Sequence, residues 1–359
     1  MGELVDSISK KCDFKTDKII FLNTSDIEDG KIVNNNCYKI SDLPGQAKKK
    51  IKNGDILFSE IRPKNKRYAL VENIDETNYV VSTKLMVLRN KDSKVLNMKY
   101  FYYFLTSPKM LRYLQSEAEA RSGTFPQITF KDNIYPITIN LPSLAEQNKI
   151  VKNIDSIVNK IKNNQKINTN LLQLSQIMFK NKFPNVNDGP DKIGAYIRNY
   201  DKDRKPLSKK QRSKMPGKYR YIGATSVNDY IAKYNFDGIY LLLGEDGTVQ
   251  DINGYPVLQY IHGKFWPNNH AHVLQGNKVS TEWLYLFFLQ RNIEGIITGA
   301  VQKKISQKNL NSLSVTMPNN EELSKFDNII QPIFEQIRTL EEENERLLEI
   351  KRELLTNLF

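Results

Sequence analysis

Two segments of the chain carry apolar residues every three or four positions, which is the spacing of an amphipathic helix. In the first segment these residues are Ile150, Ile154, Ile157, Ile161, Leu171 and Met178. In the second they are Phe326, Ile330, Ile333, Ile337, Leu340, Leu347 and Leu354. Ser143 and Glu146 form a capping box before the first run, and Asn319 and Glu322 form one before the second. The pattern predicts two long helices.

The second helix repeats the first at a fixed distance in the sequence. LLQLSQIMFKNKF (171–183) resembles LLEIKRELLTNLF (347–359), and the offset is 347 − 171 = 176. The same offset relates Gly123 to Gly299 and Pro142 to Pro318. Farther upstream, NGDILFSEIRP (53–63) resembles DGIYLLLGEDG (237–247), with loops of different length between. A repeat of this period indicates two similar units.

The repeat divides the chain into four segments of an α+β protein. They are an α/β domain (1–141), a helix (142–183), a second α/β domain (184–317) and a second helix (318–359). Asn168 and Asn344 fall at equivalent seam positions, and a lone seam Asn typically fixes the register of a coiled coil. We therefore expect the helices to pair antiparallel, with the domains related by a pseudo-twofold axis. The alternative is two helices that each dock only on their own domain. Pro332 predicts a kink or a new helix start.

The charge is strongly basic and is organised in two places. The formal net charge is +13, and residues 202–220 hold nine Lys or Arg against one Asp. Residues 48–67 hold eight Lys or Arg. Such charge favours a nucleic-acid partner, although a generic basic surface is the alternative. No apolar run is long enough to span a membrane. Cys12 and Cys37 are the only cysteines, which is typical of a reducing cytoplasm.

DNA sequence is read by side chains at base edges, while phosphate contacts supply affinity and register. Candidate side chains lie where basic, amide or hydroxyl groups adjoin turn residues. In the first domain they are Arg62, Lys64, Lys66, Arg67, Arg121, Ser122 and Thr124. In the second they are Lys214, Lys218, Tyr219, Arg220, Thr225, Ser226, Asn228, Lys303 and Lys304. For any one of them, the alternative is a solvated surface group.

Motifs for catalysis are missing from the sequence. An amino-methyltransferase needs an Asp- or Asn-Pro-Pro-aromatic loop, and a phosphate loop needs GxxxxGK[ST]; neither occurs. A loose nuclease-like spacing at Pro190, Asp191, Asp203 and Lys205 lies in a polar segment. His270 and His272 share a strand face without a nearby Cys, so a structural or DNA-contacting role is favoured over zinc. We expect no catalytic residue and no metal.

Four motifs, together with the order of the segments, are typical of one known family. They are PSLAEQNKIV (142–151), YIGATSVNDYI (221–231), FDGIYLLLGEDG (236–247) and TGAVQKKIS (298–306). In these motifs and in its whole layout the chain resembles the DNA-specificity subunit of type I restriction-modification systems. The second helix departs from the family pattern at NNEELSKFDNII (319–330). The resemblance implies a non-catalytic chain that binds a bipartite site on double-stranded DNA. It also implies two modification subunits, which bind S-adenosylmethionine and methylate adenine at N6, and in some systems restriction subunits.

Two other classes of function remain open from the sequence alone. One is a stand-alone DNA-modifying enzyme, either a nuclease or a methyltransferase. The other is a coiled-coil adaptor whose basic charge is incidental.

Overall fold

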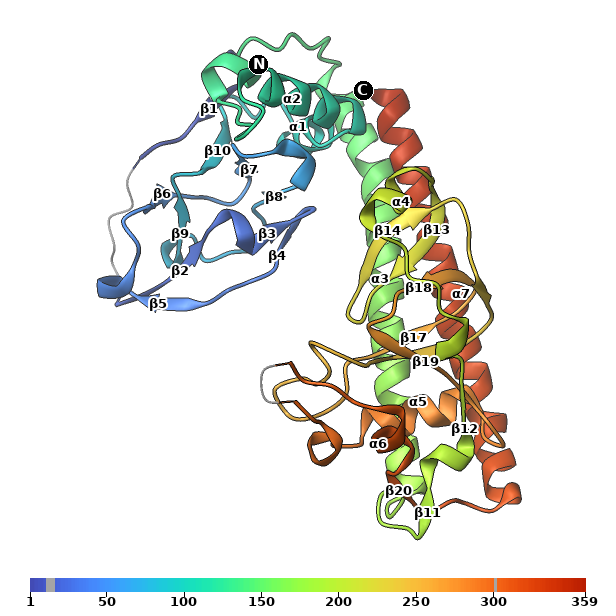
Figure 1. Cartoon of the computed structure of the whole chain (residues 1–359). Coiled ribbons are helices and arrows are strands. Elements are labelled where there is room, and N and C mark those ends of the chain that lie inside the picture. Colours follow the sequence, from blue (N-terminus) through green and yellow to red (C-terminus); the bar gives the residue numbers. More distant parts are fainter. Residues whose placement is uncertain (11–16, 300–301) are drawn as a thin grey trace. The chain divides into compact units, whose positions relative to one another are not determined.

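The computed structural model describes residues 1–10, 17–299 and 302–359, so Cys12 lies outside the described residues. The chain forms two compact units. The first comprises Met1–Lys162 with Asn344–Phe359, and the second comprises Asn163–Glu343. The two long helices, α3 (Leu144–Lys182) and α7 (Asn320–Leu358), each contribute a part to both units. They are the green and red helices of Figure 1.

The first domain contains two four-stranded sheets. One has the order β1-β10-β7-β8 and the other β5-β2-β9-β6, in which only β2 and β9 run parallel. The strands are β1 (Val5–Ser7), β2 (Lys18–Leu22), β5 (Cys37–Lys39), β6 (Ala47–Lys50), β7 (Ile56–Ser59), β8 (Tyr68–Leu70), β9 (Tyr79–Ser82) and β10 (Leu85–Asn90), with a small ribbon of β3 (Ile27–Glu28) and β4 (Lys31–Ile32). Helices α1 (Met98–Leu105) and α2 (Pro108–Arg121) follow.

Successive side chains of the central strands β7 and β10 point to opposite faces of the first sheet, and each face packs against its own hydrophobic core. Leu57 and Val87 pack toward the residues of β2 and β9. Their neighbours Phe58 and Met86 point the other way, into a core that also holds residues of α1 and α2. This period of two is expected for a sheet covered on both faces. The layers are therefore sheet, sheet and helix.

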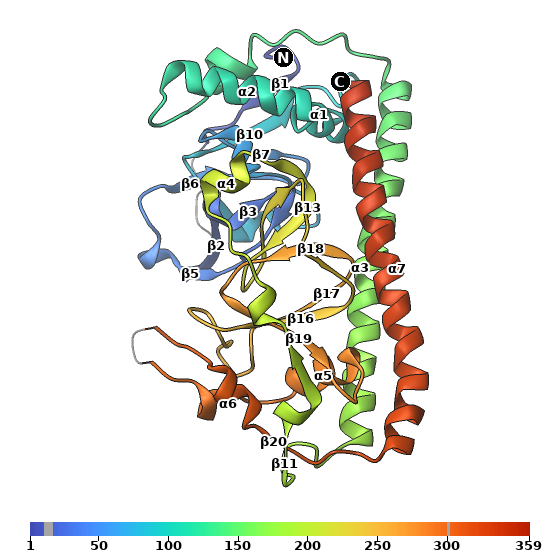
Figure 2. The same ribbon diagram turned by 45° about the vertical axis from the view of Figure 1, so that its right-hand side comes forward.

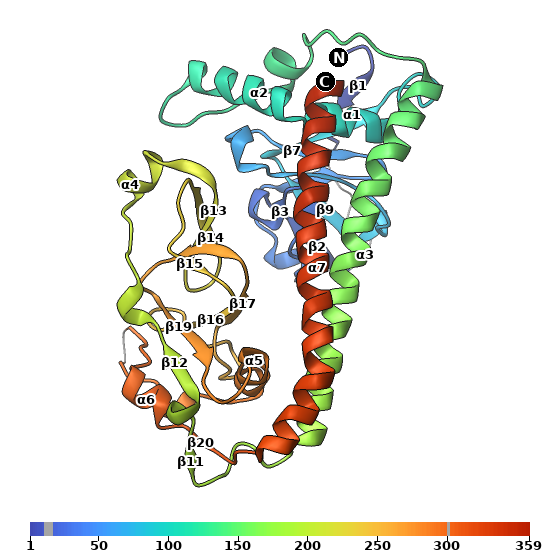
Figure 3. The same ribbon diagram turned by 90° about the vertical axis from the view of Figure 1, so that its right-hand side faces the viewer.

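The second domain, whose strands are labelled in Figure 3, repeats the strand order of both four-stranded sheets. Its sheets have the orders β12-β19-β16-β17 and β14-β13-β18-β15, and again a single pair, β13 and β18, is parallel. The strands are β12 (Ile197–Asn199), β13 (Pro216–Ile222), β14 (Val227–Ile231), β15 (Phe236–Asp237), β16 (Tyr240–Gly244), β17 (Leu258–Ile261), β18 (Lys264–Pro267) and β19 (Ala271–Gly276). The predicted α+β fold with an internal repeat is confirmed.

The second domain adds a few elements of its own. These are β11 (Asp191–Lys192) paired with β20 (Ser314–Val315), and the short helices α4 (Lys209–Ser213) and α6 (Gln307–Asn311). Helix α5 (Thr281–Leu289) is the counterpart of α1, since both carry an aromatic run that follows the last strand of the sheet. Trp283 on α5 and Phe101 on α1 are both fully buried, so these aromatic residues belong to the cores.

The long helices run antiparallel and pack together in each unit (Figure 2). In the first unit, Ile154 of α3 and Leu355 of α7 belong to the core that the domain provides. In the second unit, the Phe179 ring of α3 lies 5.7 Å from the Phe326 ring of α7, measured between centroids. Both rings also join the core of the second domain. The helices therefore pair with each other and dock on the domains at the same time.

All predicted seam residues are at least partly buried. The buried ones are Ile154, Ile161, Phe326, Ile330, Ile337, Leu340 and Asn344. The half-buried ones are Ile150, Ile157, Asn168, Leu171, Met178, Ile333, Leu347 and Leu354. Asn168 donates to the backbone carbonyl of Ile337 at 3.2 Å. Asn164, one turn earlier, is fully buried and donates to the Glu343 carboxylate at 2.7 Å.

The expectation that Pro332 starts a new helix is wrong. Helix α7 runs without interruption from Asn320 to Leu358 with this proline inside it. Pro332 is exposed, so water can solvate the carbonyl that the missing N–H leaves free. Its buried neighbours Ile330 and Phe334 hold the helix against the second domain.

Candidate DNA-binding interface

Each domain has two loops that are joined by a short antiparallel bridge, and the loops of the two domains correspond. Ile61 pairs with Gln127 in a short antiparallel bridge, and Asp246 pairs with Lys304 in the same way. The offsets are 246 − 61 = 185 and 304 − 127 = 177. The backbone hydrogen bonds on either side of each bridge also correspond. The Ile128 amide donates to the Glu60 carbonyl, as the Ile305 amide does to the Glu245 carbonyl, both at 2.9 Å. The Arg62 amide donates to the Pro126 carbonyl at 3.1 Å, as the Gly247 amide does to the Lys303 carbonyl at 3.0 Å. We call residues 60–62 with 126–128, and 245–247 with 303–305, the loop clamps.

Most of the predicted DNA-contacting residues of the first domain gather around its loop clamp. The Arg62 guanidinium donates to the backbone carbonyl of Thr124 at 3.3 Å. The Ser122 hydroxyl accepts from the amide of Phe125 in the same turn. Lys64 lies beside α2 and pairs with Glu119 at 3.4 Å. Arg121 is the last residue of α2 and pairs with Asp132 at 2.7 Å.

Two predicted residues of the first domain, Lys66 and Arg67, contact residues 27–29 and not the loop clamp. Lys66 pairs with Asp29 at 3.2 Å. Arg67 donates to the backbone carbonyl of Ile27 at 3.0 Å and lies 3.7 Å from the Glu28 carboxylate. Burial lowers the pKa of Lys351 on α7, and the Asp29 and Lys66 charges act on it in opposite directions. Lys66 therefore faces α7, and Arg67 supports the fold.

The predicted residues of the second domain form three separate groups. Thr225 and Ser226 are exposed at the turn between β13 and β14, and Asn228 is exposed near the start of β14. Lys214 and Lys218 are exposed at the other end of β13, where the Tyr219 ring packs on Tyr234 with centroids 4.9 Å apart. Lys303 and Lys304 belong to the loop clamp. Arg220 is used internally, because it donates to the His262 carbonyl at 2.5 Å.

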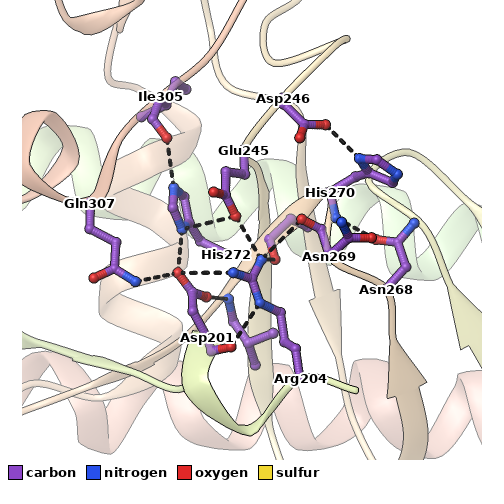
Figure 4. Close-up of polar contacts among 12 residues, drawn as sticks. Asp201, Arg204, Glu245, Asp246, Asn268, Asn269, His270, His272, Ile305 and Gln307 are labelled. Atoms are coloured by element: carbon purple, nitrogen blue, oxygen red, sulfur yellow. Dashed lines mark hydrogen bonds and ion pairs between the residues drawn. The ribbon is translucent and has the colours of Figure 1, made fainter. Parts of the chain in front are cut away.

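A buried charged network stands behind the second loop clamp (Figure 4). His272 contacts the Asp201 carboxylate through Nδ1 at 2.6 Å and the Ile305 carbonyl through Nε2 at 2.9 Å. Both ring nitrogens of His272 are therefore engaged by protein groups. Arg204 pairs with Glu245 at 2.7 Å and lies 3.6 Å from Asp201. The network ties β19 to both strands of the clamp.

These neighbours hold the Asp201 carboxylate in its charged form. Burial alone would raise the pKa of Asp201. The hydrogen bond and charge of His272, the Val273 amide and the Gln307 side chain outweigh burial and lower the pKa to about 2. The Lys304 ammonium lies 3.6 Å from the Glu245 carboxylate. Each carboxylate of the network therefore has a basic partner.

The ligand atoms of Asp201, Glu245 and His272 lie within 4.8 Å of one another, which raises the question of a metal ion. Both nitrogens of His272 are already engaged. The Arg204 guanidinium occupies the position between the two carboxylates that a cation would take. The donor set therefore fits an ion-pair network and does not fit a metal. Asp191 and Asp203, from the nuclease-like spacing, are exposed residues on β11 and on a separate turn.

The network predicts a loss of stability in acid. A lowered native pKa means that Asp201 stabilises the fold above the unfolded value of 3.8, and that this contribution disappears as pH falls toward 2. The free energy of unfolding that Asp201 contributes should shrink by about 1 kcal/mol between pH 5 and pH 3. Urea unfolding of the wild type and of Asp201→Asn at both pH values measures it. A difference between the two proteins that stays constant with pH would contradict the assignment.

Two features of this surface could not be predicted from the sequence. Phe125 is 50% exposed beside Arg62, although aromatic residues are usually buried. Glu245 was visible only as part of the FDGIYLLLGEDG motif, without its partners.

Among the described residues, no helix combines the length and apolar character needed to cross a membrane.

Comparison with known proteins extends these observations. A family model described as the type I restriction modification DNA specificity domain matches residues 1–173 and 197–352. The HindI specificity subunit of Haemophilus influenzae is 43% identical over 184 residues, which are 51% of this chain and 39% of that protein. A putative type I restriction enzyme specificity subunit of the same organism is 28% identical over 159 residues, 44% of this chain and 37% of that protein. The chain thus matches about two fifths of the length of each relative.

A solved structure shares the fold. The type I restriction-modification system S subunit from M. genitalium superposes with a TM-score of 0.51 at 16% identity, covering 100% of this chain and 94% of that one. The family model covers both domains and most of both long helices. The chain therefore belongs to the family of type I restriction-modification DNA specificity proteins.

Proposed function

We propose that this chain is the DNA-recognition subunit of a type I restriction-modification complex and binds a bipartite, asymmetric site. The observation that carries the proposal is the pair of domains with one topology and two different loop surfaces. The first loop clamp presents Arg62, and the second presents Gly247 at the matching position. Domains that share a scaffold and differ in their loops are suited to reading two different half-sites.

The paired helices supply the spacing in this proposal. Helices α3 and α7 both extend through the two units, so their packing would fix the separation of the half-sites. A helix of 39 residues is about 58 Å long. At about 3.4 Å per base pair, the site would extend over roughly 10–20 base pairs. One groove-bound module at each end follows the half-site logic of dimeric DNA readers.

The chemistry on DNA would belong to other subunits. We propose two modification subunits that carry S-adenosylmethionine and methylate adenine, with restriction subunits as further partners. Apolar side chains exposed on α3 support a docking role for the helices. Ile167, Leu174 and Ile177 are 44%, 46% and 58% exposed and recur at helical spacing.

The salt dependence of DNA binding tests the proposal. Lysine and arginine side chains on phosphates release counterions, so the logarithm of the binding constant should fall linearly and steeply with the logarithm of salt concentration. With about six phosphate contacts, affinity should drop by about 1,000-fold between 50 and 200 mM salt. Filter binding of the purified chain to duplex DNA across a salt series measures this slope.

Two results would contradict the proposal. A weak, flat salt response would favour an adaptor whose basic charge is incidental. Methylation or cleavage by the chain alone, with Mg²⁺ and S-adenosylmethionine supplied, would favour a stand-alone enzyme.

A further inference from the structure

The two loop clamps place Arg62 and Gly247 at equivalent positions, each donating its backbone amide across the clamp. Both residues have a left-handed backbone, with φ of 45° at Arg62 and 77° at Gly247. Glycine adopts this conformation freely, whereas a side chain at Cβ is crowded by the neighbouring carbonyl. The backbone of the clamp therefore favours glycine at this position.

Arg62 is unfavourable here for a second reason. It precedes Pro63, whose ring restricts the preceding residue to extended conformations. The first domain thus keeps an arginine where the fold is better served by glycine. An observed strained residue justifies a search for a function of its side chain.

The Arg62 side chain contributes little to the fold. It is exposed, and its one hydrogen bond is the 3.3 Å contact with the Thr124 carbonyl. Among the described residues no carboxylate lies within ion-pair distance of it. In contrast, Arg89 and Arg121 each form a 2.7 Å pair with an aspartate. Most of the guanidinium donors of Arg62 are therefore free for a ligand.

The surroundings of Arg62 suit a base edge. The contact with Thr124 orients the guanidinium along the loop that also carries Ser122 and the exposed Phe125. A guanidinium presents two parallel N–H donors, and guanine presents the matching acceptors O6 and N7 in the major groove. A clamp that fixes the Arg62 backbone also limits the entropy lost when the side chain binds.

We propose that Arg62 is a specificity-determining residue that reads one guanine of the half-site bound by the first domain. The second domain has no side chain at Gly247 and reads its own half-site with other groups. This inference rests on the proposed function, since it requires that the domains bind DNA.

Binding-site selection with the full chain and its co-purifying subunits tests the inference. Arg62→Gly should lower affinity for the selected site about 10- to 100-fold and abolish a guanine preference at one position of one half-site. Its thermal midpoint should equal or exceed that of the wild type, because glycine relieves the backbone. A merely structural arginine would show the opposite, a lower midpoint with an unchanged guanine preference.

Two further variants sharpen the comparison. Lys278→Gly is a matched control, because Lys278 is also an exposed basic residue with a left-handed backbone, at φ 65°; its base preferences should not change. Arg62→Gln retains a side chain in the clamp and should lose the guanine preference as Arg62→Gly does. If the wild type selects a site and Arg62→Gly selects the same one, this inference fails while the proposed function stands. If the wild type selects no site, the proposed function itself fails.

Discussion

Replacing Phe179 with alanine should lower the free energy of unfolding of the second unit by about 3–5 kcal/mol. Phe179 is fully buried where α3 meets both α7 and the second domain. Its ring lies 5.2 Å from Phe183, 5.4 Å from Trp283 and 5.7 Å from Phe326, between centroids. Truncation leaves a cavity bordered by Phe183, Trp283 of α5 and Phe326 of α7, and these rings would have to move together to fill it. The effect should therefore be near the upper end for a core aromatic.

Urea unfolding followed by tryptophan fluorescence measures this loss, because buried Trp283 stands beside the substituted ring. Ile177→Ala is the matched control on the same helix, two residues away and 58% exposed. It should change the free energy of unfolding by less than about 0.5 kcal/mol. Equal effects of the two substitutions would show that α3 is not packed between α7 and the domain.

The helices and the repeat could be predicted because they rest on local patterns. Apolar spacing and capping boxes fix α3 and α7, and the 176-residue offset relates all 39 residues of one helix to the other. The pattern missed Asn164, because a polar residue carries no hydrophobic signal. Its burial depends on Glu343, which is 179 positions away in the sequence. The helix start predicted at Pro332 rested on the missing backbone hydrogen bond alone. The helix continues there because Pro332 is exposed, so that water can solvate the free carbonyl.

The interface was harder to predict, because the sequence shows where basic residues occur but not which of them already bond to groups of their own domain. Arg67 and Arg220 looked like Arg62 in the sequence, yet both are half-buried and donate to carbonyls inside their own domain, whereas Arg62 is exposed. The burial that distinguishes them depends on tertiary contacts. The His272–Asp201 pair joins residues 71 positions apart, and no motif links them. The sequence could supply the loops, but the match of residues 53–63 with 237–247 pairs Pro63 with Gly247. The hydrogen bonds of the loop clamps show that Arg62 is the residue equivalent to Gly247.

Inserting one helical turn into both long helices should lengthen the gap between the half-sites and leave both half-site sequences unchanged. The Asn164–Glu343 and Asn168–Ile337 contacts show where the helices face each other. Four residues would be added to α3 between Asn164 and Asn168, and four to α7 between Ile337 and Glu343. The two insertions would then pack against each other. They add about 6 Å, equivalent to about one or two base pairs.

The same insertion in α3 alone is the informative control. It would displace Phe179 and the other core residues of α3 by one turn relative to α7, while the loops that contact DNA remain intact. We expect loss of selective binding, because one helix would be longer than its partner and the seam could not stay in register.

Binding-site selection on the wild type and on the double insertion shows whether the paired helices set the spacing of the half-sites. We expect two short blocks of fixed bases in both proteins, identical in sequence and separated by a gap that is about one or two base pairs longer in the variant. A single continuous block, or a gap that does not change with the helices, would show that the helices do not set this spacing.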